Sequence, residues 1–159
     1  MPIIDWSNDR GEPRFCGMNA LDENELTAIR TLYRAIGEGN PALLEKAVAP
    51  DWQDIPLGPG QEPGPRGFGP VFAMLGAAFP DLAVEIDEIL GGAGHAAVRA
   101  RMTGTHRGPI FGIPATNKPI SIRIHEVHHL SGGRITHTFH MEDWLGFFQQ
   151  IGAFPVVTK

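Results

Sequence analysis

The chain has 159 residues, of which 42% are hydrophobic and 19% are charged, and its net charge is −5. This length and composition fit one globular domain and exclude a wholly disordered chain. No basic cluster offsets the acidic balance, so a surface that binds nucleic acid is not expected. No apolar stretch approaches the roughly 20 residues that cross a bilayer, and the single cysteine, Cys16, has no internal disulfide partner. We therefore expect a cytoplasmic protein that binds neither membranes nor nucleic acid.

The first half of the chain has the periodicity of helices. Apolar residues recur at three- and four-residue spacing within residues 21–39, which predicts a helix, and Asn40-Pro41 is typical of the start of a short second helix. Residues 50–67 are dense in proline and glycine and are interpreted as a loop, whose length favours a functional or mobile segment. A third helix is predicted over residues 68–79.

The period of the apolar residues changes from 3.6 to 2 after residue 82, which predicts strands. The predicted strands cover residues 82–90, 95–105, 120–130 and 134–141, and a last short helix covers residues 144–151. Gly132-Gly133 joins the last two strands as an antiparallel hairpin. Helices followed by an antiparallel sheet indicate the α+β class, with the helices on one sheet face. Residues 1–20 lack periodicity and are interpreted as an N-terminal arm, and residues 21–159 as a single domain.

Histidines are concentrated in the predicted sheet, since six of the seven lie between residues 106 and 140. Histidine is a frequent general acid or base because its pKa lies near neutrality. Alternation places Glu126 among isoleucines on one strand face, and the hairpin puts Glu126 and His140 on nearby rungs. The pair has the arrangement in which a carboxylate orients an imidazole and the imidazole moves a proton.

Structural roles remain open for the same residues. Glu126 could instead form an ion pair with Arg99 or Arg101 across the sheet, and His140 could be a buried hydrogen-bonding residue. His125, His129 and His137 are expected at the surface or at an interface. His106, which precedes a Gly-Pro loop, is expected to form hydrogen bonds in a turn. A metal site is not expected, because neighbouring histidines on one strand point to opposite faces and the thiol is remote.

Aromatic side chains are spread over the predicted helices and the sheet, and most are expected in the core. A few of them would line a cavity for a flat apolar ligand, as small-molecule sites generally do. We expect Trp52, Phe72 and Phe111 to contact such a ligand.

Several short motifs resemble those of one known family. They are Gly104-Thr105-His106-Arg107-Gly108, Phe111-Gly112-Ile113-Pro114-Ala115-Thr116, Ala49-Pro50-Asp51-Trp52, Phe79-Pro80-Asp81-Leu82 and Gly133-Arg134-Ile135. In this order they resemble the SnoaL-like polyketide (ester) cyclases, over about residues 22–155. The resemblance implies the cone-shaped fold of nuclear transport factor 2, in which three helices close over a curved sheet around a deep hydrophobic pocket. It also implies that no cofactor is used and that the outer sheet face forms a homodimer or higher oligomer.

The resemblance also implies positions for the site. In the characterised cyclases an acidic residue on the last strand is the general acid/base for aldol closure of a polyketide methyl ester, and His140 holds the matching position. Glu126 holds the neighbouring pocket position, which is His or Asp in relatives, so the acid and the imidazole are exchanged between strands. Thr138-Phe139 replaces a His-Trp pair, and Ile55 replaces a histidine that follows the first-loop acid, here Asp54.

Together these observations predict a cofactor-free acid/base enzyme that acts on a flat, hydrophobic carbonyl compound. His140 would abstract a proton α to the carbonyl, Glu126 would orient the ring or share that proton, and His128 or Thr138 would hydrogen-bond the enolate oxygen. We also expect Asp54 to contact the substrate. Two alternatives use the same pocket: a non-catalytic protein that binds a small apolar molecule, and a dehydratase or isomerase.

Overall fold

The computed structural model describes residues 20–154, so the predicted N-terminal arm lies almost wholly outside the described residues. The elements in chain order are α1 (Glu23–Glu38), α2 (Pro41–Ala47), β1 (Val48–Ile55), the 3-10 helix η2 (Pro65–Phe68), α3 (Gly69–Ala78), β2 (Ala83–Gly92), β3 (His95–Thr105), β4 (Pro119–Ser131), β5 (Arg134–Glu142) and α4 (Trp144–Ile151). Apart from β1 and η2, which were not predicted, this is the predicted order of an α+β domain. Among the described helices none is long and apolar enough to cross a membrane.

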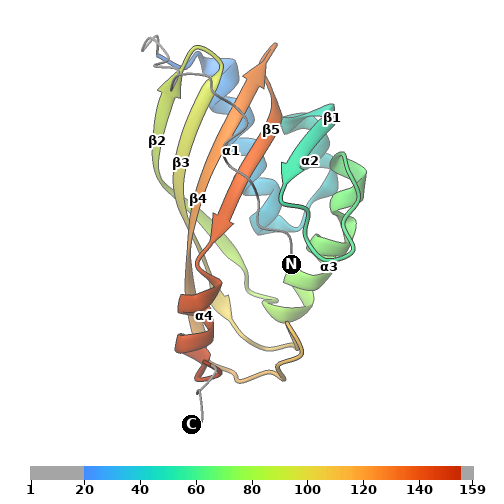
Figure 1. The fold of residues 1–159 in the computed structure, drawn as a ribbon, viewed down its shortest axis with the longest axis vertical. Helices are drawn as coiled ribbons and strands as arrows, with labels where there is room; N and C mark the ends of the chain where they lie inside the picture. The colour runs from blue at the N-terminus through green and yellow to red at the C-terminus, as the bar shows by residue number, and fades with distance from the viewer. Residues whose placement is uncertain (1–19, 155–159) are drawn as a thin grey trace, which may run out of the picture.

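The strands form one curved sheet in the order β1-β5-β4-β3-β2 (Figure 1). Strands β2 to β5 pair antiparallel, as predicted, whereas β1 pairs parallel with β5 at the edge. The interpretation of residues 50–67 as a loop was therefore wrong for the end of β1 and for η2. Pro50 lies inside β1 and its register shifts between Val48 and Gln53, so the strand has no regular alternation in the sequence.

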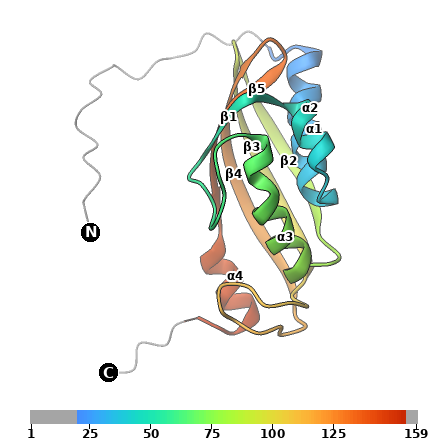
Figure 2. The same ribbon diagram turned by 90° about the vertical axis from the view of Figure 1, so that its right-hand side faces the viewer.

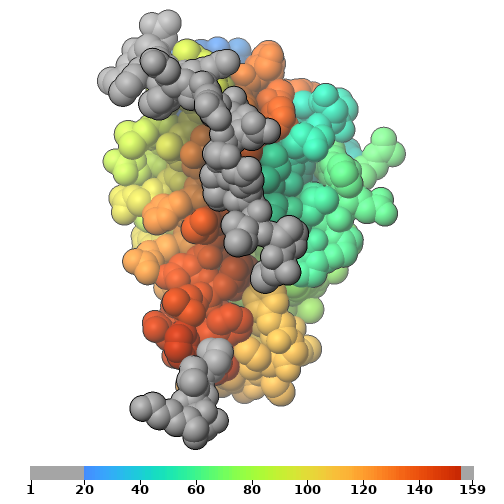
Figure 3. Space-filling model, viewed as in Figure 1, coloured from blue at the N-terminus to red at the C-terminus, as the bar shows by residue number. Residues whose placement is uncertain are grey.

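Helices α1, α2 and α3 cover one face of the sheet, and α4 lies beside the end of β4 (Figure 2). The first helix begins with a capping box in which Asp22 accepts a hydrogen bond from the Glu25 amide and the Glu25 carboxylate accepts one from the Asp22 amide. Its apolar stripe packs on the sheet, and Ile29, Leu32 and Tyr33 are at most 1% exposed. The opposite sheet face presents β2 to β5 with α4 below them (Figure 3).

A bulge in the β4–β5 hairpin decides which residues of β5 face the helices. Leu130 pairs with Ile135 and His129 pairs with His137, which leaves Thr136 as an extra residue on β5. Regular alternation along the whole of β5 would place Ile135 on the same face as His137, but with the bulge between them Ile135 lies under the helices and is fully buried. After the extra residue the side chains of β5 alternate regularly again, and Thr138 and His140 face the helices.

Three of the five motifs that carried the family resemblance join the segment after β3 to the end of α3. Asp81, at the end of α3, accepts hydrogen bonds from both the amide and the hydroxyl of Thr105, at the end of β3. The amides of Arg107 and Gly108 donate to the carbonyl of Ala78. His106 is fully buried, and its Nδ1 lies 3.0 Å from the Thr116 hydroxyl. These contacts fasten the β3–β4 connection to the C-terminal end of α3.

Candidate active site

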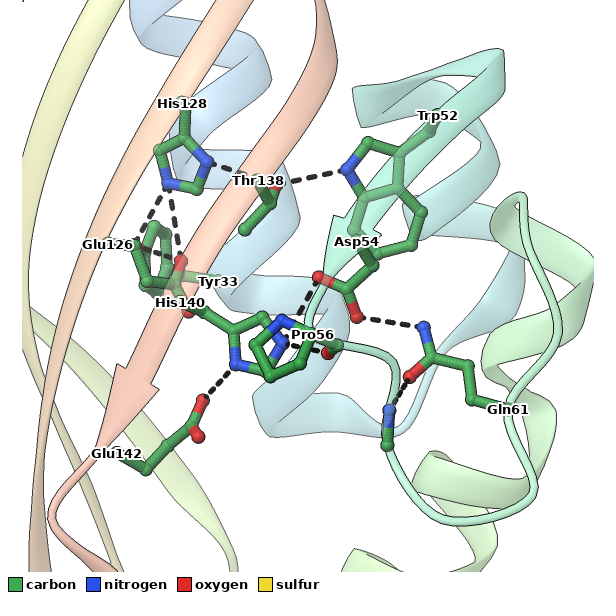
Figure 4. A network of polar contacts seen from close by, with 11 residues as sticks. Tyr33, Trp52, Asp54, Pro56, Gln61, Glu126, His128, Thr138, His140 and Glu142 are labelled. Atoms are coloured by element: carbon green, nitrogen blue, oxygen red, sulfur yellow. Dashed lines mark hydrogen bonds and ion pairs between the residues drawn. The ribbon is translucent and has the colours of Figure 1, made fainter. Parts of the chain in front are cut away.

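A cavity of about 450 Å³ lies between the inner face of the sheet and the segments from β1 to α3. Most of its wall is apolar and includes the rings of Trp52, Phe68, Phe111 and Trp144. The polar groups on the wall come from β1, β4 and β5 and from the loop after β1. Two strand pairings, β1 with β5 and β4 with β5, therefore position these polar side chains (Figure 4).

His140, on β5, is held at both ring nitrogens. Its Nδ1 lies 2.9 Å from Oε1 of Glu142, two residues along the same strand face, and its Nε2 lies 2.7 Å from the carbonyl oxygen of Pro56. The second nitrogen also lies 3.5 Å from Oδ1 of Asp54. All three neighbours are acceptors, and a neutral imidazole has only one N–H to donate. The surroundings therefore favour the imidazolium form of His140.

The pKa of His140 follows from these neighbours. Burial alone disfavours the charged ring, but the hydrogen bond and charge of Glu142, the charge of Asp54 and the Pro56 carbonyl together raise its pKa to about 9. The ring is thus a cation at neutral pH, inside a largely apolar cavity.

Asp54, on β1, is the carboxylate nearest to this cation. Its second oxygen, Oδ2, accepts a hydrogen bond of 2.8 Å from the Gln61 amide, whose own oxygen accepts one from the amide of Gly58. Asp54 is 6% exposed, and burial raises its pKa to about 6 although His140 and Gln61 oppose the shift. A carboxylate with a raised pKa is a stronger base than an ordinary aspartate and is still mostly ionised at pH 7.

Glu126, on β4, belongs to a second network. Its Oε2 accepts a hydrogen bond of 2.6 Å from the Tyr33 hydroxyl and lies 3.3 Å from Nε2 of His128. Burial and the charge of Glu126 raise the pKa of Tyr33, so the phenol stays protonated and donates. The tyrosine reaches Glu126 from α1, across the interface between the helix and the sheet.

The tautomer of His128 follows from its neighbours. Nε2 faces Glu126 and the oxygen of Tyr33, which is 3.1 Å away and donates its own hydrogen to Glu126, so Nε2 carries the proton. On the other side Nδ1 accepts from the Thr138 hydroxyl at 3.1 Å, and that hydroxyl accepts from Nε1 of Trp52 at 2.9 Å. A buried chain from Trp52 through Thr138 thus directs the Nε2–H of His128 toward the Glu126 carboxylate, as a second donor beside the Tyr33 hydroxyl.

The sequence model of SnoaL-like polyketide cyclases matches residues 27–151 of the chain. The protein belongs to the SnoaL-like polyketide cyclase family. Solved structures of similar fold include TsrD of Streptomyces laurentii, with 24% identity and a TM-score of 0.75 over 85% of this chain and all of that one. IdmH of Streptomyces antibioticus, named as a candidate polyketide cyclase, has 24% identity and a TM-score of 0.71 over 80% of this chain and 98% of that one. No curated protein matches the sequence.

A Bacillus cereus protein, also named as a candidate polyketide cyclase, gives 24% identity and a TM-score of 0.72 over 83% of each chain. These likenesses confirm the predicted fold of the SnoaL-like and nuclear transport factor 2-like proteins. Identities of this size carry the fold alone, so the chemistry of the present SnoaL-like protein is argued from its own residues.

Most of the predicted site residues of this SnoaL-like protein come together. The cavity wall includes Trp52, Asp54, Phe111, Glu126, Thr138 and His140. Phe72 and His128 lie behind that wall: Phe72 packs against Phe68 with ring centroids 4.9 Å apart, and His128 is fully buried. The alternative pairing of Glu126 with an arginine was wrong, because Arg99 pairs with Glu88 and Arg101 with Asp87 on the outer sheet face.

Three functional side chains were missed by sequence reasoning. Glu142 had a usable signal, because it lies two residues after His140 and so shares its strand face. Tyr33 was assigned to the apolar stripe of its helix, and a lone tyrosine in that stripe marks a hydroxyl that needs a partner. Gln61 follows β1 in a segment of prolines and glycines, where no pattern indicates a direction. Within residues 20–154 no group of three His, Cys, Asp or Glu side chains is arranged to hold a metal ion.

Proposed function

We propose that this protein is a cofactor-independent acid/base enzyme that moves a proton at the carbon α to a carbonyl in a flat, hydrophobic ligand. One observation carries the proposal: Asp54, a carboxylate of raised pKa, and His140, a cationic ring, lie 3.5 Å apart on the wall of one apolar cavity. Both pKa values are raised, that of Asp54 to about 6 and that of His140 to about 9, so between these values Asp54 is ionised and His140 is protonated, and a base and an acid are present at the same pH. Membership of the SnoaL-like cyclases agrees with this chemistry.

In the proposed reaction Asp54 takes the α proton. The ring of His140 stays protonated, and its charge stabilises the enolate oxygen that forms as the C–H bond breaks. In an aldol-type closure the enolate carbon then attacks a second carbonyl carbon of the same molecule, and Asp54 returns its proton to the new alkoxide. No atom is lost from the substrate in this sequence.

The sequence alone predicted that His140 abstracts the proton. The acceptors around its ring instead favour Asp54 as the base and His140 as the group that stabilises the enolate. A base needs a free lone pair, and both ring nitrogens of His140 face oxygen acceptors. Asp54 has no such restriction, because its Oδ1 contacts only the N–H that His140 shares with Pro56. Glu126 is held by its own donors and orients neither partner directly.

The test is exchange of α protons for deuterium in a bicyclic ketone such as 2-tetralone, followed by NMR in D₂O. We expect the protein to accelerate exchange, and Asp54→Asn and His140→Gln each to lose roughly 10²- to 10⁴-fold of that acceleration. His125→Gln is the matched control, since His125 lies on the exposed outer face of β4.

A protein that binds the ketone and leaves its α protons unexchanged would contradict the proposal and favour the non-catalytic binding protein. Exchange that survives in Asp54→Asn would remove the role of Asp54. A dehydratase or isomerase shares the deprotonation step, so analysis of the product, with or without loss of water, separates those reactions from ring closure.

A further inference from the structure

The charges on the cavity wall are unbalanced. Three carboxylates line the cavity, from Asp54, Glu126 and Glu142, and within residues 20–154 the only basic side chain on the same wall is His140. When all four are ionised, three negative charges face one positive charge and a net charge of −2 remains. Lysine and arginine are absent from the described part of the wall.

The neighbours of these carboxylates do not neutralise the excess. Glu126 is bound by the neutral donors Tyr33 and His128, and the second oxygen of Asp54 is bound by the Gln61 amide. Neutral donors orient a carboxylate and stabilise its ionised form, but they leave its charge in the cavity. Arg99 and Arg101 of β3 do not compensate, because both lie on the outer face with acidic partners.

We propose that the cavity selects its ligand by charge: it accepts a flat ligand that is neutral or carries a protonated amine, and it rejects the same scaffold when it carries a carboxylate. A carboxylate would add a fourth negative charge in a partly desolvated space, where like charges repel more strongly than in water. A protonated amine would reduce the excess and would meet the aromatic faces of Trp52 and Trp144. The inference deepens the proposed function by naming the charge class of its substrate.

Three naphthalenes of nearly equal shape test the proposal by calorimetry at pH 7.5: 2-naphthylmethanol, 2-naphthylmethylamine and 2-naphthoate. We expect the amine to bind at least as tightly as the alcohol. The carboxylate should bind at least tenfold more weakly than the alcohol, a difference of about 1.4 kcal/mol. A carboxylate that binds as tightly as the alcohol overturns the proposal.

Variants assign the effect to the cavity. Glu126→Gln removes one negative charge and keeps an oxygen that accepts from Tyr33, so the ratio of the Kd for 2-naphthoate to the Kd for the alcohol should fall several-fold. Glu85→Gln is the matched control, because Glu85 is on the exposed outer face and its loss changes the net charge equally. Equal effects of the two substitutions would attribute the selectivity to overall charge and overturn the proposal.

The unmodified protein provides a second measurement if Glu126→Gln does not fold. Asp54 faces His140, Glu126 and Glu142, and its carboxyl, with a pKa of about 6, gains a proton between pH 7.5 and pH 5. The affinity for 2-naphthoate should therefore rise over this interval and that for the amine should fall, since both probes keep their charges there. Affinities that do not change with pH contradict the proposal.

The outcomes separate this inference from the proposed function. A reversed order of affinities, with catalysed deuterium exchange of 2-tetralone intact, overturns the charge selection alone. The expected order without any catalysed exchange overturns the enzyme and keeps the charge selection. If none of the three naphthalenes binds at millimolar concentration, both are overturned, because the cavity then does not take flat apolar molecules.

Discussion

Glu126 and His140 are register partners on β4 and β5, yet their side chains belong to different hydrogen-bond networks. Glu126 is bound by Tyr33 and His128, whereas His140 is bound by Glu142 and Pro56. Adjacency on the sheet brings both groups to one cavity, and the residues around each of them decide its charge. The carboxylates that contact the ring of His140 are therefore those of Glu142 and Asp54, and not that of its register partner Glu126.

The first prediction concerns which carboxylate keeps His140 protonated. Glu142→Gln removes the negative partner of Nδ1, so the pKa of His140 should fall from about 9 by one unit or more. NMR titration of the His140 ring protons measures this directly. Glu126→Gln serves as the comparison, because the carboxylate of Glu126 faces Tyr33 and His128, and it should leave the titration nearly unchanged. A larger shift in Glu126→Gln than in Glu142→Gln would contradict the separation of the two networks.

The second prediction is a bell-shaped pH dependence of kcat/KM for the α-proton exchange. The proposed reaction needs Asp54 ionised and His140 protonated, so the rate should rise as the pH increases past about 6 and fall as it increases past about 9. The two limbs report the free enzyme. A rate that instead rises through a single pKa near 9 would mean that deprotonated His140 is the base, as the sequence alone suggested.

The elements and the site were predictable to different degrees. Strand β3 and helix α4 were predicted at their observed bounds, because their alternation and their apolar spacing are uninterrupted. Strand β1 was missed, since it pairs parallel with a strand far away in the chain and Pro50 breaks its pattern. Long-range pairing of this kind leaves no local signal in the sequence.

In the site, too, features that depend on local rules were predictable and features that depend on long-range pairing were not. The approach of Glu126 to His140 followed from hairpin register and alternation, which are local rules, and the register confirms it. The charge state of His140 depends on Pro56, from the segment after β1, and on Asp54 across the parallel pair. The family motifs could not predict this charge state either, because none of them contains a residue that contacts the ring of His140.

The third prediction tests that structural role. A Cβ at Gly108 would overlap the carbonyl oxygen of Ala77, so Gly108→Ala must displace the loop from the end of α3. We expect a loss in the free energy of unfolding of roughly 2 kcal/mol or more, measured by urea denaturation. Gly76→Ala is the matched control: its Cβ would meet nothing within 4 Å on the exposed side of α3. That change should stabilise the helix by roughly 0.5–1 kcal/mol.

A neutral or stabilising effect of Gly108→Ala would mean that the loop yields without cost. The motif would then not be needed to hold the β3–β4 connection, and its presence in this chain would require a different explanation.

The fourth prediction concerns the outer face of the sheet, where three neighbouring apolar side chains are exposed. Val127 is 44% exposed, Phe139, its register partner, 40%, and Met141 73%. Contiguous exposed apolar surface is typical of an interface. We propose that a second copy of the chain docks on this apolar ridge, which the resemblance to the cyclase family also implies.

Size-exclusion chromatography with light scattering, at micromolar protein concentration, measures the molar mass of this assembly. We expect a dimer for the unmodified chain and a monomer for the double variant Val127→Glu and Met141→Glu, because a symmetric contact would bury like charges against one another. Leu145→Glu is the control: Leu145 is 58% exposed, but it lies on α4, away from the ridge. A monomeric unmodified chain, or a dimer that survives both ridge substitutions, would contradict docking on the ridge.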